Sequence, residues 1–370
     1  MKKTIHQWIN RYWYACASPG ALARCVHAWM ARLIRARRQR WIVREKVAFS
    51  VPIVVVGNLT VGGTGKTPLL MALAHWMGEA GLRVGVVSRG YGAHAPYYPY
   101  FVSSDTPVAC GGDEPCMLAE RLNIPVVIDG DRPRAVAALL KKWPKVNIIL
   151  SDDGLQHYAL DRAVEMVVVD GQRRLGNGLC LPLGPLREPI DRLSSVSLIV
   201  VNGGDVLSTS ESRGLSLPPQ ISMNIEPEGL LRLKDQRLLP IGTLADLLVG
   251  EGVAVAGIGN PERFFHTLRQ LGLTFKPRVF TDHHTYTEKE IASLRRASWV
   301  LMTEKDAVKL RSAVMENGYV LRVNATVSVA DWLQVAMVLR SQLQPWSDIS
   351  NLLAHNLERL RLRLGVHSKN

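Results

Sequence analysis

Acidic residues are nearly absent from the first part of this 370-residue chain. Residues 1–46 contain eleven Lys and Arg but a single acid, Glu45, so this segment carries +10 of the formal net charge of +13. A long apolar run is also missing: no window supplies the roughly 20 apolar residues of a membrane span. Arg24 and the basic cluster at 32–40 interrupt the apolar core, roughly 7–15 residues long, that a secretory signal peptide requires. Composition thus argues against both a transmembrane segment and a cleaved signal.

Paired cysteines are the second absence. The chain has no C-x-x-C pair, and its cysteine count is odd, which argues against a disulfide framework and a zinc site and predicts reduced, cytosolic thiols. The five cysteines are Cys16, Cys25, Cys110, Cys116 and Cys180. Low-complexity runs and repeats are also missing. With 47% hydrophobic and 21% charged residues, the chain is expected to fold into two ordinary domains.

The basic N-terminal segment is rich in aromatic residues. It holds four of the nine tryptophans, Trp8, Trp13, Trp29 and Trp41. Aromatic side chains interleaved with cations predict a basic amphipathic helix over 1–47 that lies in an anionic membrane interface. A nucleic-acid-binding arm is the first alternative, but tryptophan and leucine on one helix fit lipid better, so no nucleic acid is expected as a partner. A helix that packs on the protein with solvated charges is the second alternative.

The rest of the chain alternates strand and helix patterns. The β-branched run 51–58 predicts a buried parallel strand, and a glycine-rich loop and an apolar helix over 68–81 follow it. The fold class is therefore α/β, a doubly wound, mostly parallel sheet with ligands at the carboxyl ends of its strands. We expect an ATP-binding domain at 48–220, a smaller α/β domain with a linker hairpin at 221–327, and helices at 328–370. The last of these ends in a second basic, apolar stretch, 357–364.

The loop 57-GNLTVGGTGKTP-68 nearly matches the P-loop pattern G-x-x-x-x-G-K-[ST], with Thr60 where the first glycine is expected. The following glycines leave the backbone N–H groups open to a phosphate. We expect Lys66 to reach the β- and γ-phosphates and Thr67 to ligate Mg²⁺. Thr60 preserves the cradle if its φ is negative. The predicted nucleotide-binding residues of the loop are Thr60, Gly62, Gly63, Thr64, Gly65, Lys66 and Thr67.

Three further loops carry candidate ligands. Asp152 and Asp153 follow a buried strand, as a magnesium-binding acid does in P-loop proteins, although D-D-G is also common turn chemistry. Asp113 and Glu114 precede a helix, where a carboxylate often only caps. Arg187 and Glu188, in 181-LPLGPLREP-189, are placed to reach a phosphate or a metal.

Two sequences of the second domain are harder to interpret. In 280-FTDHHTY-286 the adjacent His283 and His284 lack further ligands at zinc spacing, so a carboxylate–histidine base is a better hypothesis than a metal site. The stretch 303-TEKDAVKL-310 is predicted to cap a helix and to pair internally.

Taken together, these motifs resemble the tetraacyldisaccharide 4′-kinase family, the lipid A 4′-kinases of Gram-negative bacteria. The resemblance covers residues from about 50 to 310 in family order. It is carried by G-N-L-T-V-G-G-T-G-K-T-P (57–68), S-R-G-Y-G (88–92), G-D-E-P (112–115), D-D-G-L-Q-H (152–157), G-P-L-R-E-P (184–189), D-H-H-T-Y (282–286) and T-E-K-D-A-V-K (303–309). Leu155 departs from the usual phenylalanine, and we expect only a packing change there.

The resemblance implies a peripheral kinase on the cytoplasmic face of the inner membrane. Such an enzyme transfers the γ-phosphate of ATP, with Mg²⁺, to the 4′-hydroxyl of a tetraacylated glucosamine disaccharide 1-phosphate in lipid A biosynthesis. By motif, Asp113 is the catalytic base, with His283 as its partner from the second domain, and Lys66 is the third catalytic residue. Glu114 and Arg187 join the nucleotide site. The implied metal ligands are Thr67, Asp152, Asp153 and Glu188.

Two other classes remain as alternatives. A membrane-associated partitioning or switch ATPase shares G-G-x-G-K-T, but its signature lysine early in the loop is absent, because residues 60 and 61 are Thr60 and Val61. A nucleic-acid-binding ATPase has only the basic segment in its favour. A base and its partner on different domains would also imply domain closure before chemistry.

Overall fold

The computed structural model describes residues 2–15, 19–311, 313 and 315–363. Cys16 and the last residues of the predicted C-terminal region, 364–370, lie outside the described residues. The chain forms two compact units. The first comprises Met1–Ser88, Asp131–Asn224 and Thr326–Asn370, and the second comprises Arg89–Gly130 and Ile225–Ala325.

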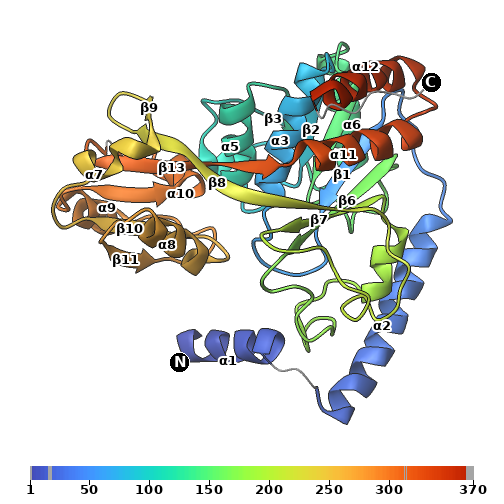
Figure 1. The fold of residues 1–370 in the computed structure, drawn as a ribbon, viewed down its shortest axis with the longest axis horizontal. Helices are drawn as coiled ribbons and strands as arrows, with labels where there is room; N and C mark the ends of the chain where they lie inside the picture. The colour runs from blue at the N-terminus through green and yellow to red at the C-terminus, as the bar shows by residue number, and fades with distance from the viewer. Residues whose placement is uncertain (1, 16–18, 312, 314, 364–370) are drawn as a thin grey trace. The chain divides into compact units, whose positions relative to one another are not determined.

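The first unit is built around a parallel sheet (Figure 1). Its strand order is β8–β7–β6–β1–β5–β2. The strands are β1 (Ile53–Gly57), β2 (Val84–Ser88), β5 (Ile148–Asp152), β6 (Val164–Asp170), β7 (Leu198–Asn202) and the first residues of β8 (Gln220–Arg232). The five residues of β1 are all buried, as predicted for a central parallel strand. The register pairs Val56 with Asp152, so the end of β5 lies beside the start of the glycine-rich loop.

Helices cover this sheet, and the last two helices belong to the same unit. They are α3 (Lys66–Glu79), α6 (Arg132–Lys142), α11 (Val329–Gln342) and α12 (Ser347–Arg363), with the 3₁₀-helix η1 (Ile190–Ser195). Trp76 of α3 stacks on Trp332 of α11 with ring centroids 5.2 Å apart. The helical pattern predicted over 328–370 is thus part of the P-loop unit, because its apolar face covers α3.

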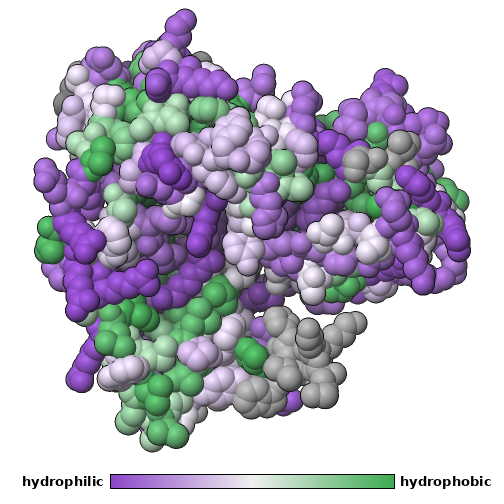
Figure 2. All heavy atoms as spheres, turned by 180° about the vertical axis from the view of Figure 1, so that it is seen from behind, coloured by the Kyte–Doolittle hydropathy of each residue, from purple (hydrophilic) through white to green (hydrophobic). Residues whose placement is uncertain are grey.

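The basic N-terminal segment forms two helices, α1 (Lys2–Ala15) and α2 (Ala21–Ile42), where a single helix was predicted. One face of α2 packs on the first unit through buried Ala31 and through Ile34. A different face carries an exposed apolar stripe at helical spacing: Leu22, Val26, Trp29 and Leu33. Figure 2 shows hydrophobic atoms at the surface of this part of the molecule. In the part of the chain that the structure describes, no helix combines the length and apolar composition needed to span a bilayer.

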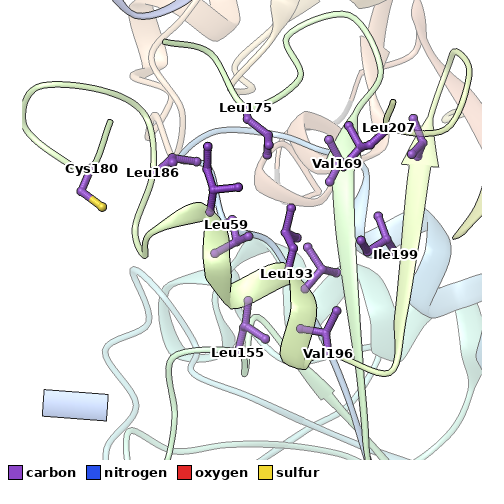
Figure 3. Packing of buried hydrophobic residues seen from close by; sticks show 13 residues of the cluster. Leu59, Leu155, Val169, Leu175, Cys180, Leu186, Leu193, Val196, Ile199 and Leu207 are labelled. Carbon is purple, nitrogen blue, oxygen red and sulfur yellow. The ribbon is translucent and has the colours of Figure 1, made fainter. Parts of the chain in front are cut away.

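A hydrophobic cluster lies beneath the nucleotide loop and the proline-bounded loop 181–189 (Figure 3). It joins Leu59 of the first loop and Leu186 of the second to η1 through Leu193. Leu155, where the family pattern has phenylalanine, is fully buried in it. The cluster holds the two loops in a fixed geometry, which a phosphate site requires.

The second unit contains the parallel strands β11, β10, β12 and β13, in this order, with β8 next to β13. The antiparallel pair of β8 and β9 forms the predicted hairpin, and β3 and β4 form another antiparallel pair. Its strands are β3 (Tyr100–Val102), β4 (Val126–Ile128), β9 (Arg237–Leu239), β10 (Val253–Ala256), β11 (Lys276–Val279), β12 (Val300–Thr303) and β13 (Gly318–Val327). Its helices are α4 (Val108–Gly111), α5 (Asp113–Leu122), α7 (Leu244–Leu247), α8 (Pro261–Gln270), α9 (Glu288–Arg295) and α10 (Glu304–Lys309), with the 3₁₀-helix η2 (Ile241–Thr243).

The division of the chain differs from the predicted one at a further segment. Residues 89–130, expected within the P-loop domain 48–220, belong to the second unit. The reason is packing and charge: α5 contacts α10, where Arg121 is ion-paired with Glu304 at 3.0 Å. This assignment places Asp113 in the second unit.

Candidate active site

The glycine-rich loop joins β1 to α3, the context that a P-loop requires. Gly62 (φ 103°) and Gly65 (φ 95°) adopt left-handed conformations that other residues rarely take. Thr60 does not have a positive φ; it is buried and forms a bridge with Leu186. Thr60 therefore meets the predicted condition for an intact cradle, because its position does not require the positive φ that only glycine adopts readily.

Two buried asparagines brace the loop. Asn58 Nδ2 donates to the Thr60 carbonyl at 2.7 Å, and Asn202 Nδ2 donates to the Thr64 carbonyl at 2.8 Å. Lys66 Nζ lies 3.2 Å from Asn58 Oδ1 and 3.5 Å from Asp153 Oδ1. The lysine is therefore held over the loop before any phosphate binds. Sequence reasoning missed both asparagines, although each ends an apolar strand.

Asp153 and Arg187 form a close pair, with Arg187 Nη1 2.9 Å from both carboxylate oxygens. Burial alone would raise the pKa of Asp153, but the charges of Lys66 and Arg187 outweigh it and lower that pKa. Asp153 has φ 46°, a conformation that costs energy for a non-glycine residue and occurs often at functional sites. The D-D-G turn and the charged site coexist at this position.

Glu188 is buried and fully engaged. Its carboxylate accepts from Gln156 Nε2 at 2.9 Å and from the hydroxyl of Tyr158, and Arg192 Nε lies 3.7 Å away. Burial and the neighbouring Glu188 carboxylate raise the pKa of Tyr158, so the phenol remains a proton donor. Tyr158 is a third residue that sequence reasoning missed.

The donor atoms of the predicted metal ligands suit Mg²⁺. Thr67, Asp152, Asp153 and Glu188 offer only hydroxyl and carboxylate oxygens, which Mg²⁺ prefers. Asp152 is buried at the end of β5, in register with the residue that precedes the loop. These donors fit the ion, although Asp153 and Glu188 are at present engaged by Arg187 and Tyr158.

In the second unit Asp113 meets His283. Asp113 begins α5 with its side chain buried, and His283 Nδ1 lies 3.0 Å from each of its carboxylate oxygens. The N-cap of the helix is Gly112 and not Asp113, whose Oδ1 accepts from the N–H of the next residue, Glu114, at 3.1 Å in addition to its contact with His283. The capping alternative is therefore not what this carboxylate does. The contact joins the two residues that the family motif had paired.

The adjacent histidine has a different role. His284 Nε2 lies 3.1 Å from Glu290 Oε2, and its ring stacks on Phe280 and contacts Tyr286 edge-on. His283, in contrast, has φ 59° and contacts the ring of Tyr91, with centroids 4.6 Å apart. Geometry therefore pairs His283, and not His284, with Asp113.

Lys305 completes this second group, which we term the acceptor cluster: Asp113, Glu114, Asp282, His283 and Lys305. Its Nζ lies 3.0 Å from Glu114 Oε1, 2.9 Å from Asp282 Oδ1 and 3.7 Å from Asp113 Oδ2. The sequence predicted that 303–310 caps a helix and pairs internally. Thr303 does cap α10, accepting from the Asp306 N–H at 3.2 Å, and Lys309 is ion-paired with Asp306 at 3.1 Å. Lys305 instead pairs outside this segment. No local signal identified Lys305, because its partners lie on distant segments.

The acceptor cluster shifts the pKa of Asp113. Burial alone would raise that pKa, but the hydrogen bond with His283 and the charges of Lys305, His283 and Lys309 outweigh burial and lower it. Asp113 is therefore an ionised carboxylate at neutral pH, able to accept a proton.

The parallel sheet, the phosphate-cradling loop and the lysine held over it define a P-loop kinase. The sequence model of the tetraacyldisaccharide-1-P 4′-kinase family matches residues 21–343. A tetraacyldisaccharide 4′-kinase of Legionella pneumophila (strain Corby) is 42% identical over 327 residues, which is 88% of this chain and 95% of the relative. One from Pseudomonas aeruginosa (strain LESB58) is 43% identical over 321 residues, 86% of this chain and 92% of the relative.

Among solved structures, LpxK from Aquifex aeolicus in complex with ATP is similar in fold. It shares 26% identity at a TM-score of 0.67, covering 86% of this chain and 97% of that chain. The chain belongs to the tetraacyldisaccharide-1-P 4′-kinase family. The predicted family and P-loop fold class are confirmed, and the partitioning or switch ATPase is not favoured.

Proposed function

We propose that this chain transfers the γ-phosphoryl group of ATP to the 4′-hydroxyl of a tetraacylated glucosamine disaccharide 1-phosphate. Family membership supports the donor and the acceptor, since the relatives are 4′-kinases of this disaccharide by name. The observation that carries the chemistry is the contact of buried Asp113 with His283. A carboxylate oriented by an imidazole is suited to take the proton of a sugar hydroxyl.

The donor half of the reaction belongs to the loop. Its backbone N–H groups and the start of α3 would hold the phosphates, and Lys66 would neutralise charge on the transferring group. Thr67 and Asp152 would hold Mg²⁺. By the sequence motifs, Asp153 and Glu188 would be its further ligands. The ion would neutralise the phosphate oxygens. Arg187, which now engages Asp153, would exchange that partner for a nucleotide phosphate.

The acceptor half belongs to Asp113 and His283. Asp113 would accept the hydroxyl proton as the oxygen attacks, and the imidazole would hold the carboxylate in line and share the proton. Because both residues lie in the second unit, their pairing does not depend on domain closure, contrary to the expectation from sequence. Glu114 would serve the site through Lys305, with which it is paired.

Docking on a membrane surface fits a lipid-borne acceptor. The exposed stripe of α2 offers apolar side chains for the interface, and neighbouring exposed arginines, including Arg37 and Arg40, offer charge for anionic headgroups. The reduced cysteines predicted from the sequence and the need for ATP both favour the cytoplasmic side of the membrane for this surface.

The activity is tested with the full chain, γ-labelled ATP, Mg²⁺ and the acylated disaccharide 1-phosphate in mixed micelles. We expect a lipid product that carries a second phosphate at the 4′ position, located by mass spectrometry. The Lys66→Ala protein is the control for contaminating kinases. Wild-type protein that hydrolyses ATP without forming this lipid would exclude the proposal.

The docking surface is tested by co-sedimentation with vesicles rich in phosphatidylglycerol. We expect the double variant Trp29→Glu, Leu33→Glu to lose most of its binding. The control, Ala28→Glu with Gln39→Glu, changes the charge equally at exposed positions off the stripe and should bind nearly as wild type. Equal losses in the two variants would show that charge alone, and not the apolar stripe, governs binding.

A further inference from the structure

Three carboxylates and one imidazole surround a single small volume in the second unit. Ligand atoms of Asp113, Asp282 and His283 all lie within 4.8 Å of one another, the kind of group that holds a metal ion. Glu114 adds a third carboxylate next to Asp113. The Asp113 carboxylate in particular requires a cation close by, because it is buried and an unpaired buried charge is costly.

The cation is a side chain. Lys305 Nζ lies within 3.0 Å of Glu114 and Asp282 and 3.7 Å from Asp113. Its side chain is only 12% exposed. The three carboxylates raise the pKa of Lys305 more than burial lowers it, so the ammonium is charged at neutral pH.

We propose that Lys305 is the positioning residue of the Asp113–His283 pair: its ammonium stands where a metal ion would otherwise bind, and it keeps Asp113 an ionised acceptor facing His283. The part of this inference that concerns catalysis by Asp113 rests on the proposed function. The position of the Lys305 ammonium does not depend on that function.

The other charged groups near Asp113 do not replace Lys305. Lys309, one turn further along α10, lies 3.9 Å from Asp113 and is held by Asp306 at 3.1 Å and by the Gly257 carbonyl at 3.4 Å. Tyr286 donates to the same Asp306 carboxylate. His283 is the pair's own partner, and its Nε2 lies 3.9 Å from Asp282. Among the described residues, Lys305 is the cation within 4 Å of all three carboxylates of the cluster.

The first experiment is the pH dependence of kcat/KM for the acylated acceptor. In Lys305→Met we expect the acid limb to move up by about one pH unit, because an opposite charge close to Asp113 is lost. Lys305→Arg, which keeps the charge, should restore most of the wild-type profile. Lys289→Met removes an exposed lysine of α9 and should leave the limb in place. An unmoved limb in Lys305→Met overturns the proposal.

The second experiment needs no turnover. Titration with Zn²⁺ in a calorimeter, without ATP, should reveal one more site in Lys305→Ala than in wild type, and the added His283→Ala change should remove that site. Lys305→Gln serves if the alanine variant does not fold. Equal stoichiometry in wild type and in the folded variant would refute the position of the cation. If the wild type forms no phosphorylated lipid while Lys305→Ala still gains the Zn²⁺ site, the proposed function is refuted but the position of the cation is supported.

Discussion

The nucleotide loop and the acceptor cluster are built from different materials. The loop is built from backbone: glycines with positive φ, open N–H groups and two asparagines whose side chains donate to carbonyl oxygens. The acceptor cluster is built from charged side chains of α5, the segment 282–283 and α10. The loop is thus local in sequence and fixed by its backbone conformation, whereas the acceptor cluster is assembled from distant segments and balanced by charge.

The largest effect is expected from Lys66→Ala, which removes the ammonium held over the loop by its contact with Asn58. We expect kcat to fall at least about 10³-fold, because charge on the transferring phosphoryl group loses its neutralisation. Steady-state assays with ATP and acceptor measure it. Because the cradle is backbone, ATP should still bind, with weaker affinity. Near wild-type turnover would remove the loop from the reaction.

Asp113→Asn tests the other region and should rank second. Loss of the proton acceptor is expected to lower kcat about 10²–10⁴-fold while the KM for ATP stays near its wild-type value. Measuring kcat and both KM values separates the two halves of the site. A variant as active as wild type would leave Asp113 with a purely structural part, as would one whose main defect is in ATP binding.

A smaller effect is expected from Tyr158→Phe, which removes the hydroxyl that donates to Glu188. If Glu188 serves the metal, the Mg²⁺ concentration for half-maximal activity should rise about 10–100-fold, as when an outer-shell partner is lost. Binding of Mn²⁺ with ATP, followed by electron paramagnetic resonance, gives a readout without turnover. Unchanged metal affinity in both measurements would separate Glu188 from the metal.

The smallest effect is expected from Thr60→Gly, which recreates the glycine of the usual pattern. The position does not need a positive φ, so kcat should stay within about 3-fold of wild type. Added freedom of the unfolded chain should lower the free energy of unfolding by about 0.5–1 kcal/mol. Urea denaturation measures the second effect. A strong gain in activity would mean that Thr60 restrains the loop.

The nucleotide loop could be predicted from the sequence more fully than the acceptor cluster. The P-loop was predictable because strand, glycines, lysine and helix are contiguous, and each residue type has a local reason to be there. Asp113 and His283 were paired only through the family resemblance, since 170 positions separate them. Lys305 could not be predicted, because a lysine at the start of a short helix looks like a surface charge until its partners are known.

The fold shows the same limit. The buried strands β1, β5 and β6 follow from continuous apolar runs, and their helices follow from apolar spacing. The membership of residues 89–130 in the second unit does not, because it depends on α5 packing against α10 and on the pair Arg121–Glu304. Two local signals were predictable but are absent from the predicted elements. They are the apolar run of β7 at 198–202 and the capping box of α9 at Thr287 and Glu290.

The interleaving of the two units has a consequence for biosynthesis. The P-loop unit is opened twice by segments of the other unit and is completed only by residues after Thr326. During synthesis all segments of the second unit are made before the first unit is complete. Trp76 of α3 has no stacking partner until Trp332 of α11 has been synthesised. A ribosome-bound chain therefore holds its acceptor cluster ready while the apolar face of its nucleotide unit is exposed, the interval in which it would depend most on chaperones.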